Sequence, residues 1–247
     1  MRPIVSLEDV SLRYHSLSGE TLAVSHLNLD VASGEFVSIV GPSGCGKSSV
    51  LSMLVGLLPP TEGKIAVNGA IGYMLQKDYL LEWRSIRSNA LLGLELQNKL
   101  TAENIQYVDT LLEQYGLAEF REQYPYQLSG GMRQRAALIR TLAIRPEILL
   151  LDEPFSALDY QTRLSVSDEI GSIIRQQKKT AILVTHDISE AISLSDRVIV
   201  LTKRPARVKA IHRIAFDAEI DSPMKAREAS AFKEYFNLIW KELDVHV

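Results

Sequence analysis

Hydrophobic positions divide the chain into a strand-rich first third, a helical middle and a last third in which strands and helices alternate. Residues 4–12 and 21–31 alternate between apolar and polar side chains, which is typical of half-buried strands. Asn68-Gly69 separates two further short apolar runs and is a strong hairpin signal. The first third is therefore predicted to be largely β, with further strands at 36–40, 64–67 and 71–75.

The pattern becomes helical from about residue 85 to residue 145. Thr101 can cap a helix whose first turn contains Glu103, and Gly116 can end it. Ser129 can begin another helix, which extends through Ala143. We predict a helical subdomain, about residues 83–145, inserted into an α/β domain.

In the last third, residues 148–151 form a continuous apolar run, as expected of a strand that is buried on both faces. Further strands are predicted at 181–184 and 197–201, separated by helices that follow Asp159 and Asp187. This order implies a mainly parallel, covered sheet, followed by a β return near residues 207–211.

A C-terminal helix is predicted at about residues 223–243, because Ser222-Pro223 supplies an N-cap and a first-turn proline. Its apolar stripe is most simply core packing, and a partner surface is the alternative. The stripe consists of Phe232, Phe236, Ile239, Trp240 and Leu243.

The composition is that of an ordinary soluble globular protein of 247 residues, with 46% hydrophobic and 23% charged residues. This length suits a single domain spanning residues 1–247. There is no apolar run of about eighteen residues and no signal segment, so we expect a cytoplasmic chain. The formal net charge of −3 gives no basic field, and we expect no nucleic-acid partner. The single cysteine, Cys45, excludes an internal disulfide.

The stretch that organises the chain is the glycine-rich loop from Gly41 to Ser48, which fits the pattern G-x-x-x-x-G-K-[ST] between a predicted strand and a predicted helix. Its glycines allow successive N–H groups to point at a phosphate chain, and the helix N-terminus adds to this anion site. Lys47 can reach the outer phosphates and Ser48 can ligate Mg²⁺. The sequence therefore predicts a nucleoside triphosphate site.

Two carboxylates, Asp152 and Glu153, end the predicted strand at 148–151. Ligands of open α/β sheets bind beyond the carboxyl ends of the strands. Asp152 is then placed to hold Mg²⁺, through water. Glu153 can orient or deprotonate a water beyond the γ-phosphate.

A second phosphate-receptive helix start occurs at Leu128-Ser129-Gly130-Gly131-Met132, where Ser129 caps a helix that opens with glycines. One nucleotide scarcely needs two such sites on one subunit. Here the sequence resembles the ATP-binding cassette (ABC) proteins, whose signature is Leu-Ser-Gly-Gly-Gln. The resemblance covers nearly the whole chain and implies a P-loop ATPase with a mainly parallel core sheet, an antiparallel β subdomain and an inserted helical subdomain.

The resemblance also assigns roles to weaker signals. It implies that Tyr14 stacks on adenine, that Gln76 links Mg²⁺ and the attacking water to the helical subdomain, and that His186 contacts the γ-phosphate. It makes 156–159 (Ser-Ala-Leu-Asp) an interfacial loop. His26, His212 and His246 match no such motif and receive no role. Together, the motifs and the resemblance predict catalytic roles for Lys47, Gln76, Glu153 and His186, nucleotide contacts from Tyr14, Gly41, Pro42, Ser43, Gly44, Cys45, Gly46, Lys47, Ser48, Ser49, Ser129, Gly130, Gly131 and Asp159, and ligation of Mg²⁺ by Ser48, Gln76 and Asp152.

One residue departs from the signature. Met132 stands where the family has glutamine, which could return a capping-box hydrogen bond to the backbone of Ser129. The lost bond costs about 0.5–1 kcal/mol of local order, which is too little to abolish phosphate binding. We therefore expect activity to survive.

Residues 77–85, together with 196–208, resemble the importer ATPases for nitrate, sulfonate, taurine and related solutes, although Glu82 stands where those relatives often have proline. Trp83 is either a contact for a membrane subunit or packing within the subdomain. The resemblance implies a head-to-tail dimer with a second copy, membrane permease subunits, an indirect periplasmic or lipoprotein solute-binding protein, and a peripheral location on the cytoplasmic face of the inner membrane. The alternatives are an exporter or lipid-extraction ATPase, a soluble non-transport cassette protein, and a nucleotide-binding scaffold without turnover.

Overall fold

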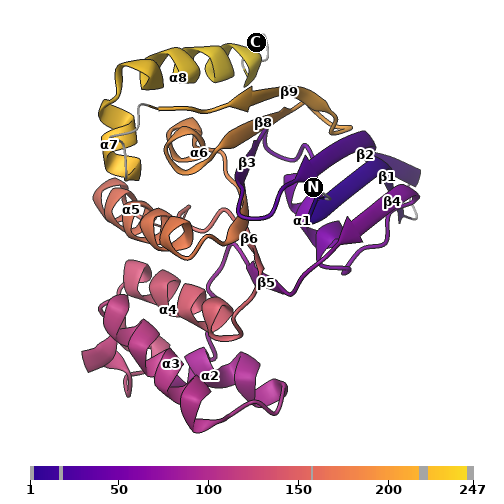
Figure 1. Cartoon of the computed structure of the whole chain (residues 1–247). Coiled ribbons are helices and arrows are strands. Elements are labelled where there is room, and N and C mark those ends of the chain that lie inside the picture. Colours follow the sequence, from indigo (N-terminus) through magenta and orange to yellow (C-terminus); the bar gives the residue numbers. More distant parts are fainter. Residues whose placement is uncertain (1–2, 17–18, 157, 217–221, 244–247) are drawn as a thin grey trace. The chain divides into compact units, whose positions relative to one another are not determined.

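A computed structural model describes residues 3–16, 19–156, 158–216 and 222–243. The chain divides into two compact units, the first made of Met1–Gly69 and Ser167–Val247 and the second of Ala70–Val166. The boundary on the C-terminal side lies within helix α5 (Tyr160–Gln176). Figure 1 gives the labels of the elements along the chain.

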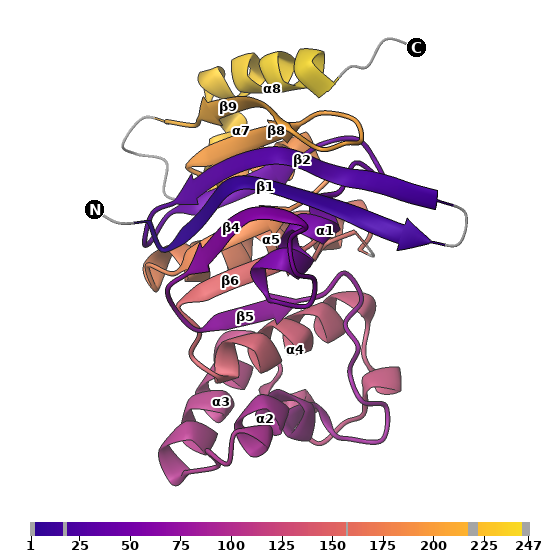
Figure 2. The same cartoon turned by 90° about the vertical axis from the view of Figure 1, so that its right-hand side faces the viewer.

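An antiparallel sheet in the first unit contains β1 (Val5–Ser16), β2 (Gly19–Val31) and β4 (Glu62–Val67), in the order β2-β1-β4. The three arrows lie side by side in Figure 2. The predicted alternation is confirmed, since Leu27, Leu29 and Val31 are all buried. β1 is the central strand, because Val5 pairs with Val31 on one side and with Val67 on the other.

The hairpin predicted at Asn68-Gly69 is wrong. β4 pairs with β1, whereas β5 (Ile71–Met74) pairs in parallel with β6 (Ile148–Asp152) in the second unit. A two-residue hairpin of type I′ needs positive φ at both central residues, and neither Asn68 nor Gly69 has it. Instead the N–H of Asn68 donates to Ile4 O at 2.8 Å, so the turn continues the pairing of β4 with the chain start.

The core sheet of the first unit has β3 (Phe36–Val40) between β7 (Thr180–Val184) and β8 (Arg197–Leu201), both parallel to it. All residues of β3 and β7 are buried, as expected for a covered parallel sheet. β9 (Val208–Arg213) runs antiparallel to β8 and forms the predicted β return. The mainly parallel, covered core sheet predicted from the sequence is therefore confirmed.

Helix α1 (Lys47–Leu54) follows β3, whereas the apolar residues after the glycine-rich loop and the Pro59-Pro60 pair predict a helix that extends through Leu57. Gly56, at φ +75, ends it before the Pro59-Pro60 pair is reached, because a glycine in the left-handed region after the last turn satisfies helix carbonyls. The N–H groups of Leu57 and Leu58 both donate to Ser52 O. Leu57 is consequently exposed.

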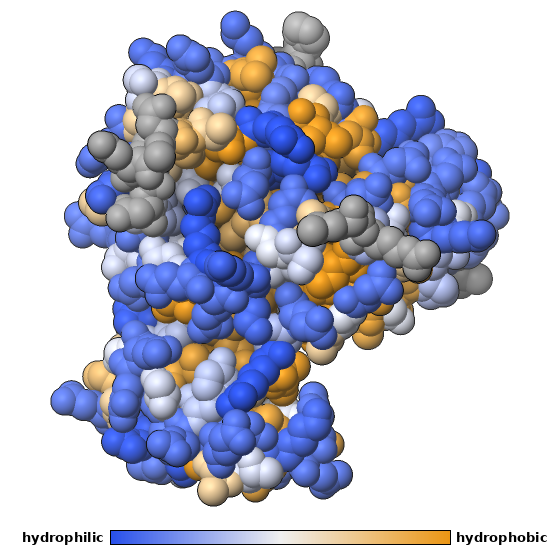
Figure 3. Space-filling model, viewed as in Figure 1, coloured by the Kyte–Doolittle hydropathy of each residue, from blue (hydrophilic) through white to orange (hydrophobic). Residues whose placement is uncertain are grey.

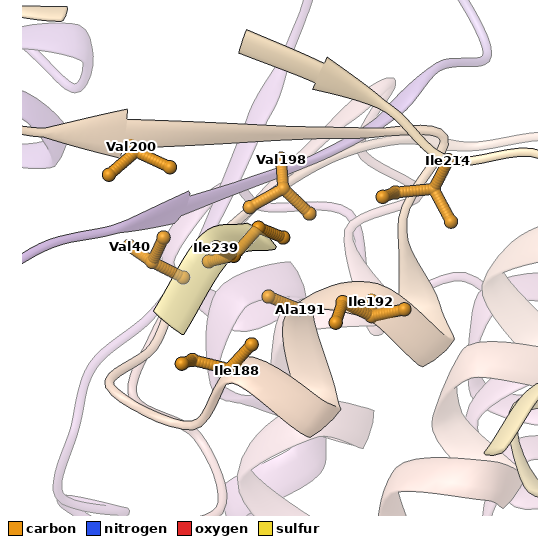
Figure 4. Close-up of a cluster of buried hydrophobic side chains, with 8 residues drawn as sticks. All are labelled: Val40, Ile188, Ala191, Ile192, Val198, Val200, Ile214 and Ile239. Carbon is orange, nitrogen blue, oxygen red and sulfur yellow. The ribbon is translucent and has the colours of Figure 1, made fainter. Parts of the chain in front are cut away.

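The C-terminal segment forms two helices, α7 (Pro223–Glu228) and α8 (Ser230–Leu243), where one was predicted. Ala229 separates them with ψ 141°, an extended conformation that turns the chain. The turn lets Ile239 of α8 enter a buried cluster with residues of β3, β8 and α6 (Ile188–Leu194), shown in Figure 4. Phe232, Phe236 and Leu243 pack against this cluster, but Trp240 is 53% exposed and is not core.

The second unit combines β5 and β6 with helices α2 (Ile86–Leu96), α3 (Ala102–Gln114) and α4 (Gly130–Ala143), with 3₁₀ turns at Ala118–Phe120 and Pro125–Gln127. The predicted caps are confirmed, because the side chains of Thr101 and Ser129 accept hydrogen bonds from Asn104 N and Met132 N. Helices α2 and α3 pack against α4, and α4 packs against β5. A Cβ on Gly72 of β5 would lie 2.8 Å from Thr141 of α4, so the glycine permits this close contact.

Within the described residues, no helix is both long enough and apolar enough to cross a membrane. The face in Figure 3 is mostly hydrophilic, with smaller hydrophobic areas between. Scattered exposed hydrophobic residues are normal on soluble proteins.

Candidate nucleotide site

The loop from Gly41 to Ser48 joins β3 to α1, as the sequence predicts. Gly44 and Gly46 have φ +71° and +125°, conformations that side-chain-bearing residues rarely adopt. A Cβ on Gly46 would also lie 3.0 Å from the carbonyl oxygen of Ala23. Glycine at these two positions therefore permits the turn that leads into α1.

The N-terminus of α1 carries no side-chain cap, because its N-cap residue is Gly46. The first N–H groups of a helix have no partner within the helix. Together with the positive end of the helix dipole they form a site that favours phosphate. This geometry fits the predicted role of the loop.

Lys47 is only 6% exposed, and its Nζ donates to Gly41 O at 2.7 Å and to Pro42 O at 3.2 Å. These bonds hold the ammonium group against the loop. An ammonium has three donors, so a phosphate oxygen can still be bound. The buried positive charge complements an anion in the loop.

Cys45 is 1% exposed, so any nucleotide contact would come from its backbone. Burial raises the pKa of its thiol, and the nearby charge of Lys47 offsets part of that effect. The thiol is therefore protonated at neutral pH, which makes it a packing group and a poor nucleophile.

Tyr14 of β1 and Ser49 of α1 were predicted separately and lie together. The Tyr14 hydroxyl is 2.9 Å from Ser49 Oγ. Tyr14 is 40% exposed, so part of its ring faces solvent beside the phosphate loop. An aromatic surface in this place can stack on a base.

His186 follows β7, the parallel neighbour of β3. Ile39 and Val184 are paired in register, so the phosphate loop and the His186 segment leave the same edge of the sheet. The His186 side chain is exposed, whereas Thr185 is buried. The first unit thus brings Tyr14, the loop and His186 to one end.

The second unit repeats this arrangement with β5 and β6, where Met74 pairs in register with Leu151. Gln76 and Glu153 follow these strand ends, and Gln76 Nε2 donates to Glu153 Oε2 at 3.2 Å. A carboxylate with an oriented amide beside it suits the orientation of a water and the acceptance of its proton.

The backbone of Glu153 has φ +44°, which is uncommon for a residue other than glycine. Both the N–H and the hydroxyl of Ser156 donate to Glu153 O, at 3.2 and 3.0 Å, and hold this turn. Left-handed residues outside glycine concentrate at functional sites, where the surroundings hold them in place. No local pattern around Glu153 predicts this conformation.

Asp152 ends β6, is 6% exposed, and accepts a hydrogen bond of 3.4 Å from the hydroxyl of Tyr73. Tyr73 was missed in the sequence, where it reads only as an alternate residue of a strand. The expected ligands Ser48, Gln76 and Asp152 supply the oxygen atoms that Mg²⁺ prefers. Within the described ranges, no group of three or more His, Cys, Asp or Glu residues could hold a metal ion.

The signature Leu128 to Met132 begins α4, with Ser129 as its N-cap. Ser129 Oγ accepts from Met132 N at 3.4 Å. Methionine cannot return this bond, as predicted. A Cβ on Gly131 would lie 2.7 Å from Thr162 Cγ2, whereas at Gly130 the nearest atom would be Leu158 Cδ2 at 3.8 Å. Gly131 therefore also serves packing against α5.

Asp159 caps α5, since its Oδ1 accepts from Thr162 N at 3.1 Å. Hydrogen bonds from the side chain and the backbone of Thr162 lower the pKa of Asp159. Its carboxylate is thus charged and fixed at the helix start. Ala157, in the same predicted loop, lies outside the described residues.

The loop after Gln76 is fastened to the signature helix by residues that the sequence did not single out. Arg133 Nε donates to Asp78 Oδ2 at 3.1 Å, and Arg140 donates to the carbonyl oxygens of Asp78 and Tyr79 at 2.6 and 2.7 Å. Burial lowers the pKa of Arg140. The buried Asn89 accepts from Leu81 N and donates to nearby carbonyls.

Trp83, in this loop, is 75% exposed. The alternative that Trp83 packs within the second unit is therefore wrong, and its contact with a membrane subunit stays a prediction.

Comparison with known proteins identifies the family. The family model described as "ABC transporter" matches residues 24–156. An uncharacterized ABC transporter ATP-binding protein of Bacillus subtilis is 44% identical over 246 residues, which cover 96% of this chain and 95% of that protein. The taurine import ATP-binding protein TauB of Roseobacter denitrificans is 36% identical over 251 residues, covering 96% of this chain and 94% of that protein.

A solved structure is also similar. It is the dimeric, post-hydrolysis state of the ATP-binding cassette MJ0796 bound to ADP and Pi, with a TM-score of 0.76 and 31% identity, covering 86% of this chain and 99% of that one. The match over residues 24–156, with relatives similar over nearly their whole length, shows that this chain belongs to the ABC transporter family of ATP-binding proteins.

Proposed function

We propose that the chain hydrolyses ATP to drive a separate membrane permease that imports a small solute of the nitrate, sulfonate or taurine type. The observation that carries hydrolysis is the hydrogen bond from Gln76 to Glu153 at the ends of β5 and β6. The proposal of import is supported by the similarity to a taurine import ATP-binding protein over 96% of the chain.

Binding of ATP is assigned to the first unit in this proposal. The phosphates are bound by the ammonium of Lys47 and by the backbone N–H groups of 41–49 apart from Pro42, which has none, and Tyr14 stacks on adenine. Ser48, Gln76 and Asp152 would hold Mg²⁺, which neutralises the charge of the phosphate oxygens.

Glu153 accepts a proton from water as the water oxygen bonds to the γ-phosphorus. The bond from that phosphorus to the bridging oxygen breaks, and ADP and phosphate result. Gln76 orients the water through its position beside Glu153. His186 contacts the γ-phosphate and stabilises its charge.

Ser129, Gly130 and Gly131 would contact the γ-phosphate of a nucleotide held by a second copy of the chain in a head-to-tail dimer. The start of α4 supplies N–H groups for this purpose. ATP can close such a dimer only through its greater affinity for the closed state. Hydrolysis removes the γ-phosphate and with it that preference. The neighbour MJ0796 was solved as a dimer.

The permease is proposed to contact the loop around Tyr79 and Trp83, which are 58% and 75% exposed. Asn89 and Arg140 hold that loop in place, and exposed aromatic residues are frequent anchors of interfaces. A solute-binding protein acts on the permease and not on this chain. The location proposed is the cytoplasmic face of the inner membrane.

Reconstitution tests the direction of transport. The chain, purified with the permease that co-purifies from membranes, is placed in vesicles so that ATP reaches it from one side only. Labelled taurine, nitrate or alkanesulfonate that moves toward the ATP side supports import. Movement of the solute away from that side supports the exporter alternative. If the chain hydrolyses ATP but no membrane protein co-purifies with it, the soluble alternative is supported. Absence of hydrolysis supports the scaffold.

A further inference from the structure

Glu190 is a carboxylate in the interior of the first unit, and the proposed mechanism gives it no task. It lies in α6 and is 4% exposed. A buried carboxylate is costly unless hydrogen bonds compensate for lost water. Glu190 Oε2 accepts a bond of 2.7 Å from the hydroxyl of Thr185, which is 1% exposed. This hydrogen bond ties α6 to the end of β7.

The Thr185 hydroxyl also acts as an acceptor. The backbone N–H of Asp187 donates to Thr185 Oγ1 at 3.0 Å. Asp187 Oδ1 in turn accepts from the N–H groups of Ser189 at 2.7 Å and Glu190 at 3.2 Å. These bonds form a closed ring through Thr185, Asp187 and Glu190.

His186 lies between two members of this ring. Its side chain is exposed, whereas Thr185 is buried and Asp187 is partly buried. Because the backbone is held on both sides, the direction in which the imidazole leaves the chain depends on the ring of bonds. A group held in place before its ligand arrives needs less reorganisation in the transition state.

We propose that Glu190 and Thr185 are positioning residues for His186. The bond from Thr185 to Glu190 fixes the backbone at 185–187 so that the imidazole meets the γ-phosphate. The inference rests on the proposed function, in which His186 contacts that phosphate. Neither positioning residue touches a reacting atom.

Kinetics of the purified chain tests this role with Glu190→Ala and Thr185→Val, which each remove the bond. Both variants should lower kcat for ATP about tenfold while KM changes less than about twofold, because His186 is misplaced for the transition state and the phosphate loop is intact. Thr185→Ser, which keeps the hydroxyl, should recover most of kcat.

Ser193→Ala is the matched control. Ser193 is a buried hydroxyl on the same helix that donates to Glu190 O, not to its carboxylate, at 3.3 Å. It should behave as the wild type. If Glu190→Ala and Thr185→Val kept the wild-type kcat while Glu153→Gln lost activity, the positioning role would be overturned and the proposed function would stand.

A second measurement is independent of turnover. The measurement is an NMR spectrum of protein in which the histidines are isotopically labelled. The ring signal of His186 is assigned by its loss in His186→Gln. Thr185→Val and Glu190→Ala should shift or broaden it, and Ser193→Ala should not. If the His186 signal had the same position and width in wild type and in all folded variants, the positioning role would be overturned. A wild type without ATPase activity would instead refute only the proposed function. If Glu190→Ala does not fold, Thr185→Val decides.

Discussion

Gln76 Nε2 lies 3.2 Å from Glu153 Oε2, at the carboxyl ends of two parallel strands that are paired in register. The bond places an amide donor beside the carboxylate proposed as the base. In Glu153→Gln the group can no longer take a proton, so turnover of ATP should fall by about 10²–10⁴. Binding of ATP should persist, because the phosphate loop is unchanged. Steady-state ATPase assays and calorimetric titration with Mg-ATP measure the two effects.

The control for that variant is Glu113→Gln, the same chemical change at an exposed position of α3. If the proposed dimer forms, Glu153→Gln should also elute from a size-exclusion column at twice the monomer mass in the presence of ATP and as a monomer in the presence of ADP. Normal turnover in Glu153→Gln would remove the role assigned to this residue.

Lys47→Met should weaken binding of ATP about 10- to 100-fold, since hydrogen bonds to charged groups contribute about 1.5–3 kcal/mol. Methionine has similar length but cannot donate to a phosphate. Binding of adenosine, which has no phosphates, should be unaffected. The control is Lys64→Met, the same substitution at an exposed lysine of β4. Equal affinities for ATP in Lys47→Met and wild type would contradict the assignment of the loop.

Local signals in the sequence predicted much of the fold because the structure realises them locally. The strand at 36–40, the caps Thr101 and Ser129 and the strand at 197–201 all depend on residues within a few positions of one another. The Asn68-Gly69 hairpin failed because strand pairing is not local. β4 gains its partner in β1, which lies about sixty residues earlier, and a turn signal cannot reveal that choice.

The candidate site shows the same division. Motif residues such as Lys47 and Glu153 are recognisable from spacing, and the roles proposed for them follow from the motifs. The positive φ of Glu153 and the bonds from Tyr73 to Asp152 and from Thr185 to Glu190 are set by tertiary structure. No pattern in the sequence reports them, because each partner is an ordinary residue of a strand or a helix.

The ion pair between α2 and α3 should make stability depend on acid pH. Arg87 Nε and Nη2 donate to Asp109 at 2.6 and 2.7 Å, and this pairing lowers the pKa of Asp109. Because the pKa of Asp109 is lower in the folded state, the ion pair stabilises the fold fully at pH values above the pKa of Asp in the unfolded chain, about 4. This stabilisation is lost as the pH falls through the pKa of Asp109 in the folded state. The side chains are 33% and 27% exposed, so the contribution is about 1 kcal/mol.

Asp109→Asn should therefore lower the urea midpoint at pH 7 and at pH 5, and the difference from wild type should shrink as pH falls below 4. Glu119→Gln, an exposed acid in the same unit, should show no such pattern. A difference that stayed constant down to pH 3 would mean that the ion pair is not its source.

Met132→Gln should restore the capping box of α4, because the glutamine amide can accept from the N–H of Ser129. The expected gain is about 0.5–1 kcal/mol in urea unfolding. The ATPase rate should stay within about tenfold of wild type, because the phosphate-binding N–H groups are already present. An increase of about a thousandfold would show that the missing cap controls the signature.

Alanine substitutions at the two signature glycines should differ in their effect on the stability of the protein, although both glycines are proposed to contact phosphate. Gly131→Ala brings a Cβ within 2.7 Å of Thr162 Cγ2 on the next helix, and threonine is β-branched and has little freedom to move away. Overpacking of this kind costs about 1–3 kcal/mol. Gly130→Ala meets only Leu158 at 3.8 Å, so the higher helix propensity of alanine should leave stability unchanged or raised. Urea unfolding of both variants without nucleotide measures this difference, and ATPase assays then report phosphate contact. If Gly131→Ala were as stable as Gly130→Ala, α5 would have to shift at Thr162 without cost, and packing would not explain the glycine at 131.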